Sequence, residues 1–117
     1  MNYDFIINHI NNSIKKVFSN YKGLYFYGSR KNGTERGDSD LDLVMITSEK
    51  IGRKEKSNIY IILGELEYEL GLFIDMPIYS EEEFKNQFYL YDEVIESGKF
   101  YAAWKSKRDK LLCWEIF

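Results

Sequence analysis

Apolar residues recur along the chain with two spacings that predict different elements. They recur every three or four positions over residues 3–20 and 57–70, which predicts two helices with one apolar stripe each. A third helix is expected to begin at Ser80, because Glu83 follows it by three positions as in a capping box, and to end at Gly98. The other apolar runs are short and are predicted as strands, at residues 24–27, 39–46, 72–79 and 100–104.

The order of these elements indicates one small domain over residues 1–117. Helices alternate with strands, and a further short helix is expected over residues 29–33. The expected fold class is therefore α/β (α+β), with a small mixed sheet and helices packed mainly on one face. A chain of 117 residues, 44% of them hydrophobic, is long enough to bury one core.

Charge and cysteine content exclude several classes of protein. The formal charge of −3 argues against a nonspecific nucleic-acid binder, which needs a dense basic surface. No apolar run approaches the length of a membrane span, and the N-terminus lacks the basic start of a signal peptide. The single cysteine, Cys113, excludes an internal disulfide and suits a reducing cytoplasm. We expect a cytoplasmic protein that acts on a small molecule or on another protein.

Two carboxylates follow each other closely at the start of the second predicted strand. Asp40 and Asp42 are separated by one residue, and because alternate strand side chains share a face, both carboxylates emerge on the same side. Carboxylates this close repel each other unless a cation lies between them. A hard divalent ion, above all Mg²⁺ held together with substrate phosphates, meets that need.

A glycine-serine turn ends the first predicted strand, shortly before the acidic pair. Gly28 lets the backbone approach a ligand closely, and Ser29 can open the short helix, whose free N–H groups and hydroxyl face an anion. A phosphate-binding turn beside a metal-binding acid pair implies a bound nucleoside triphosphate. Arg30 adjoins the turn and is a candidate for a further phosphate contact, the alternative being a solvated arginine in a polar linker.

One acid interrupts the apolar run of residues 72–79. Asp75 is the only charge there, and a charge inside a strand needs a partner or a position at the solvent. It is either a carboxylate on an exposed edge strand, which the neighbouring Pro77 favours, or a third ligand beside Asp40 and Asp42.

Together these residues resemble a family signature. The stretch at 28–43, GSRKNGTERGDSDLDL, resembles that of minimal nucleotidyltransferases of the DNA polymerase β-like superfamily, in which G-S is followed by D-x-D on a strand and by a third acid on a later strand. The resemblance implies the nucleotidyltransferase fold over nearly the whole chain. It implies that Asp40, Asp42 and Asp75 hold two Mg²⁺ ions, and that the glycine and serine of the turn fix the phosphates of the substrate, by default ATP.

The resemblance also implies an acceptor. Minimal nucleotidyltransferases resemble antitoxins whose partners are helical HEPN-type toxins, so transfer of AMP to a hydroxyl of such a partner is the first expectation. Two alternatives stay open. One is transfer to a small molecule such as an aminoglycoside, with an acidic pocket formed across a homodimer. The other is a non-catalytic nucleotide-binding module that neutralises a partner by contact, although a pure binder has no reason to bear the repulsion of clustered acids.

Overall fold

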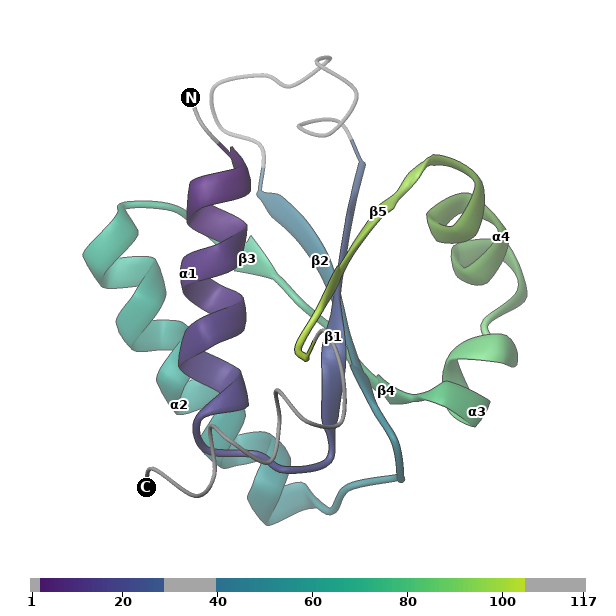
Figure 1. The fold of residues 1–117 in the computed structure, drawn as a ribbon, viewed down its shortest axis with the longest axis horizontal. Coiled ribbons are helices and arrows are strands. Elements are labelled where there is room, and N and C mark those ends of the chain that lie inside the picture. Colours follow the sequence, from purple (N-terminus) through teal and green to yellow (C-terminus); the bar gives the residue numbers. More distant parts are fainter. Residues whose placement is uncertain (1–2, 29–39, 105–117) are drawn as a thin grey trace.

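The computed structural model describes residues 3–28 and 40–104, which form four helices and five strands (Figure 1). None of these helices is both long enough and apolar enough to cross a membrane. In chain order the elements are α1 (Tyr3–Lys15), β1 (Tyr21–Tyr27), β2 (Leu41–Thr47), α2 (Arg53–Leu70), β3 (Ile74–Asp75), β4 (Ile78–Ser80), α3 (Glu81–Lys85), α4 (Phe88–Ser97) and β5 (Lys99–Ala102).

The strands form one mixed sheet. β1 runs antiparallel to β2 on one side and antiparallel to β5 on the other. β3 and β4 both run parallel to β2 along its second edge, one after the other. The expected α+β class with a small mixed sheet is therefore confirmed.

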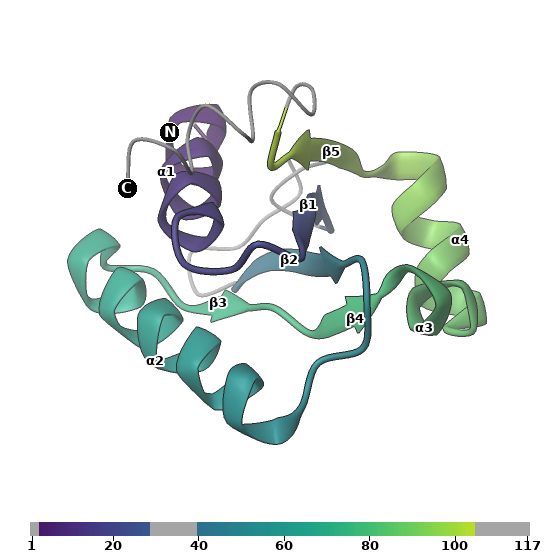
Figure 2. The same cartoon turned by 60° about the horizontal axis from the view of Figure 1, so that its bottom comes forward.

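Helices lie on both sides of the sheet, α1 and α2 on one side and α3 and α4 on the other (Figure 2). Alternate residues of β2 belong to two different cores on these sides. On one face, its odd-numbered residues pack with the apolar stripes of α1 and α2. On the other face, Val44 and Ile46 pack with Phe84 of α3 and Val94 of α4. The two long helices thus share one face, as expected, and the two short helices cover part of the second. By the same alternation Asp42 points toward the second face.

The first strand begins earlier than the apolar pattern predicts. α1 ends at Lys15 rather than near residue 20, and the turn over residues 16–20 leads into β1, which pairs with β2 from Tyr21 onward. Gly23 lies within β1, opposite β5, and a Cβ atom there would collide with the backbone carbonyl of Tyr101. Gly23, which precedes the strand predicted over residues 24–27, is therefore the point where two strands approach closely.

The second half of the chain follows the predicted order with two interruptions. The capping box is present, since the Glu83 N–H donates to the Ser80 hydroxyl at 3.1 Å and the Ser80 N–H donates to the Glu83 carboxylate at 3.0 Å. The helix that it starts is split, because α3 ends at Lys85 and α4 begins at Phe88. The strand predicted over 72–79 is split into β3 and β4.

A buried polar network ties α1 to β1 and β5. The Tyr21 hydroxyl donates to Asn11 Oδ1 at 2.5 Å, and the Asn11 amide nitrogen donates to the Ala102 carbonyl at 3.0 Å. Burial raises the pKa of the Tyr21 phenol well above its ordinary value, so the phenol stays a protonated donor. Asn11 is therefore one link between α1 and β5, and Asp4 is another, because the Lys99 Nζ lies 3.0 Å from the Asp4 carboxylate.

Replacing Asn11 is expected to destabilise the fold more than removing the Tyr21 hydroxyl does. Asn11→Ala leaves the buried Tyr21 phenol and the part-buried Ala102 carbonyl without their partner, and is expected to lower the free energy of unfolding by about 2–4 kcal/mol. Tyr21→Phe leaves only the side-chain oxygen of Asn11, Oδ1, unpaired and should lower the free energy of unfolding by about 1–2 kcal/mol. Urea unfolding followed by circular dichroism measures both. Equal losses would show that the bond to Ala102 contributes nothing.

Candidate active site

Three strands bring two acids side by side at one end of the sheet. Asp42 pairs in register with Tyr27 of β1 on one side and with Asp75 of β3 on the other. Parallel neighbours in register point the same way and lie about 4.8 Å apart, so both carboxylates emerge on the second face. Asp42 is half-buried and Asp75 is exposed. The backbone thus juxtaposes two of the three predicted acids, and their role as metal ligands stays a prediction.

Gly28 makes room for one of these carboxylates. It follows β1 directly and has a φ of +85°, in the region that favours glycine. A Cβ atom on Gly28 would collide with the carboxylate of Asp42. The glycine predicted for close approach to a ligand therefore approaches an acid of the site itself.

The other predicted site residues are placed less fully. Asp40 lies immediately before β2 and is exposed, while Ser29 and Arg30 lie outside the described residues. Within residues 3–28 and 40–104, no three His, Cys, Asp or Glu side chains form a group that could hold a metal ion. The three-carboxylate site of Asp40, Asp42 and Asp75 is therefore not assembled in this structure and stays a prediction.

The chemistry of the acid pair nevertheless fits a hard divalent cation. Asp42 and Asp75 offer only carboxylate oxygens, which are the protein ligands that Mg²⁺ prefers, and one or two carboxylates completed by substrate phosphates are typical of its sites. Two neighbouring carboxylates also repel each other until a cation lies between them. Because Gly28 has no Cβ atom, the Asp42 carboxylate can occupy the space beside it.

Tyr27 borders the acid pair, which the sequence pattern did not indicate. Burial, and after it the negative charges of Asp42, Asp75 and Glu93, raises the pKa of the Tyr27 phenol to about 12. The hydroxyl therefore stays protonated at neutral pH and can donate a hydrogen bond at the edge of the site. Its position follows from the pairing of β1 with β2, which the apolar pattern of one strand does not reveal.

The raised pKa of Tyr27 predicts a loss of stability at alkaline pH. Because the folded-state pKa of about 12 exceeds the ordinary value of 10.0, the stabilisation is complete below pH 10 and is lost as the pH rises toward 12. Tyr27→Phe is expected to flatten this part of the curve of unfolding free energy against pH. Urea midpoints between about pH 9 and pH 12 test this. Tyr68→Phe, at a residue that is 93% exposed, is the control that should keep the wild-type slope.

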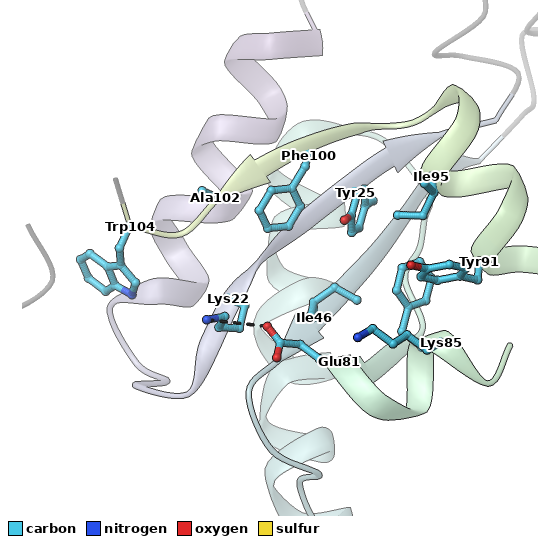
Figure 3. Close-up of a pocket in the computed structure, with 11 residues that line it drawn as sticks. Lys22, Tyr25, Ile46, Glu81, Lys85, Tyr91, Ile95, Phe100, Ala102 and Trp104 are labelled. Carbon is cyan, nitrogen blue, oxygen red and sulfur yellow. Dashed lines mark ion pairs between the residues drawn. The ribbon is translucent and has the colours of Figure 1, made fainter. Parts of the chain in front are cut away.

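A cavity of about 470 Å³ opens on the same face, toward the other end of the strands (Figure 3). Aromatic side chains such as Tyr25 and Tyr91 line it, and an ion pair of 3.7 Å between Lys22 Nζ and Glu81 Oε1 lies at its edge. None of the acids of the predicted site lines this cavity. The candidate active site is therefore separate from this cavity and lies where Tyr27 of β1, Asp42 of β2 and Asp75 of β3 are paired.

Several solved structures that are similar to this chain come from toxin–antitoxin complexes. One, a toxin–antitoxin with AMP-PNP, matches with a TM-score of 0.62 and 18% identity over 97% of this chain and 81% of that chain. The complex MntA–HepT matches with a TM-score of 0.58 and 15% identity, over 94% and 79%. A complex of a tri-AMPylated Shewanella oneidensis HEPN toxin with an MNT antitoxin matches with a TM-score of 0.55 and 15% identity, over 94% and 78%. At these identities the likeness establishes a shared fold.

A match at the level of sequence identifies the family. A comparison with curated proteins finds none that matches. Residues 12–101, however, match the family described as Polymerase beta, Nucleotidyltransferase, and this match covers most of the chain, including β1, β2 and β3. The chain therefore belongs to the polymerase beta nucleotidyltransferase family and is a nucleotidyltransferase.

Proposed function

We propose that this chain transfers AMP from ATP, with Mg²⁺, to a hydroxyl of a HEPN-type partner protein and acts as the antitoxin of a toxin–antitoxin pair. The observation that carries the proposal is the register of Asp42 with Asp75, beside a glycine whose missing side chain leaves room for the Asp42 carboxylate. Adjacent carboxylates are costly in a protein without a cation to neutralise them. In metal-assisted phosphoryl transfer, the bound cation offsets this repulsion and takes part in the reaction.

The site residues have distinct roles in this reaction. Asp42, Asp75 and Asp40 would hold Mg²⁺, which when bound stabilises the attacking and leaving oxygens of an in-line displacement. Gly28 and Ser29 would bind the β- and γ-phosphates through backbone N–H groups. The acceptor oxygen bonds to the α-phosphorus while the bond from that phosphorus to the oxygen bridging to the β-phosphate breaks. Pyrophosphate leaves, and the acceptor hydroxyl gives its proton to the solvent beside Asp75.

The choice of nucleotide and partner is supported by the neighbours in fold. One similar structure contains AMP-PNP, and another contains a tri-AMPylated HEPN toxin together with an MNT antitoxin. The formal charge of −3 agrees with a protein acceptor better than with a nucleic acid. In the proposed reaction, the acceptor that reaches Asp42 and Asp75 is therefore a hydroxyl of a second protein.

Transfer of radioactive label tests the proposal. The chain is incubated with Mg²⁺, a lysate of the source cells and each of the four α-³²P nucleoside triphosphates in turn. We expect one labelled protein, from ATP, and no label after chelation with EDTA. The matched control is the double variant Asp40→Asn, Asp42→Asn, which should label nothing.

Two other results would contradict the proposal in different ways. Label that moves with a small molecule on thin-layer chromatography would identify a small-molecule acceptor. Full neutralisation of a co-expressed toxin by the double variant would identify a binding module, because contact alone would then suffice.

A further inference from the structure

The strand that carries Asp75 is held to the sheet by few backbone hydrogen bonds. β3 comprises only Ile74 and Asp75 and lies at the end of the strand order. On its inner side, the Leu41 N–H donates to the Phe73 carbonyl at 2.8 Å. An edge strand of two residues has too short a ladder to fix its own register. On the far side of Pro77, β4 continues in the same register with β2, and the Met45 N–H donates to the Pro77 carbonyl at 3.0 Å. Bonds to the outer edge of β3 would add to this hold on Asp75.

Two side chains of α2 bond the outer edge of this segment. The Ile74 N–H donates to Glu67 Oε2 at 2.9 Å, and the Tyr60 hydroxyl donates to the Met76 carbonyl at 3.1 Å. Ile74 and Met76 are the two neighbours of Asp75, and their backbone groups point to the edge opposite β2 because alternate residues of a strand bond to the same side. One helix therefore holds the chain immediately before and immediately after the acid.

The position of Glu67 in its own helix supports this role. Tyr60 and Glu67 are seven residues apart, which is two turns, so they share one face of α2. A carboxylate near the C-terminus of a helix is unfavourable with the helix dipole, and the last turn of α2 contains no basic residue. The helix alone does not account for a glutamate there, whereas the charge-assisted bond to the Ile74 N–H does.

We propose that Glu67 and Tyr60 are positioning residues, which keep Asp75 in register with Asp42 for metal binding and transfer. The consequence for transfer rests on the proposed function, whereas the two hydrogen bonds do not depend on it. Neither residue touches the reacting atoms in this scheme. Both act through the backbone on either side of Asp75.

Glu67 variants separate positioning from general stability. Glu67→Ala removes the acceptor, and Glu67→Gln keeps an oxygen that can accept from the Ile74 N–H. We expect Glu67→Ala to lower both the transfer rate and the affinity for Mn²⁺, used as a paramagnetic probe, by about tenfold, and Glu67→Gln to restore most of both. Hydrogen exchange of the Ile74 amide should rise about tenfold in the alanine variant. Glu65→Ala, at an exposed glutamate of the same helix, is the matched control.

Tyr60 allows the same comparison without a change of charge. Tyr60→Phe removes one hydroxyl from a side chain that is 45% exposed, so the fold is retained. We expect Mn²⁺ binding to weaken severalfold, with Tyr68→Phe on the same helix as the unchanged control. Unchanged binding in both Tyr60→Phe and Glu67→Ala would overturn the inference.

A double-mutant cycle tests whether Glu67 acts through Asp75. In the Asp75→Asn background, Glu67→Ala should cause no further loss of Mn²⁺ affinity or of residual transfer. A loss that persists undiminished would overturn the inference, because Glu67 would then act elsewhere. If the wild-type chain transfers no nucleotide, the proposed function fails, and the Mn²⁺ affinities and amide exchange rates still decide the positioning role.

Discussion

Replacing Asp42 by asparagine lowers the rate of nucleotide transfer by about a hundredfold to a thousandfold and leaves the domain folded. Charge stabilisation by a bound metal ion contributes several kcal/mol to such reactions, and each 1.4 kcal/mol is about tenfold in rate. Without metal, Asp42→Asn removes the repulsion between Asp42 and its neighbour Asp75, so the free energy of unfolding should stay the same or rise. Transfer of label from α-³²P ATP and urea unfolding measure the two effects.

The control for Asp42 is an acid outside the site. Asp92→Asn makes the same chemical change at an exposed position of α4 and is expected to retain wild-type transfer. A variant of Asp42 that lost activity only in proportion to lost stability would contradict the proposed role. Asp75→Asn should give a loss of the same order as Asp42→Asn, because the two acids are paired in register.

Gly28→Ala is expected to reduce transfer by about a hundredfold and to destabilise the fold as well. An alanine at a φ of +85° costs about 1–2 kcal/mol in backbone strain. Its Cβ atom would also occupy the space of the Asp42 carboxylate and force that side chain to move. Displacement of a reacting geometry by about 1 Å can cost on the order of a hundredfold in rate.

Gly71 provides a matched control for the backbone contribution. It has a φ of +67°, and a Cβ atom there would meet no other atom within 4 Å. Gly71→Ala should therefore show a similar loss of unfolding free energy with unchanged transfer. If the two glycine variants lose activity equally, the contact between Gly28 and Asp42 has no functional part.

Local signals in the sequence predicted local structure well. The capping box at Ser80 and Glu83 depends only on residues within a few positions, and it is present in the structure. The helix predicted to end at residue 70 does end there. The resemblance to the nucleotidyltransferase family also predicted that the carboxylate of Asp75 lies near Asp42. The structure adds the register of the two strands, while the metal site itself stays a prediction.

The sequence pattern did not predict features that depend on contacts between residues far apart in the chain. The first strand was predicted to begin only at residue 24, because nothing near Gly23 reveals that Ala102 pairs with it in the sheet. Glu67 was not singled out in the sequence, because its hydrogen-bond partner is the Ile74 N–H of β3. Ser29 and Arg30 lie outside the described residues, so their proposed contacts with phosphate are still untested.

The hydrogen bond between Asn11 and Ala102 also constrains the order in which the protein assembles during translation. The two residues are 91 positions apart, so the ribosome has made almost the whole described chain before α1 gains this bond. The hairpin of β1 and β2 closes a much shorter loop, which costs less entropy and forms earlier. On a nascent chain, β2, which carries Asp42, is therefore already paired with β1 before Asn11 of α1 bonds to Ala102.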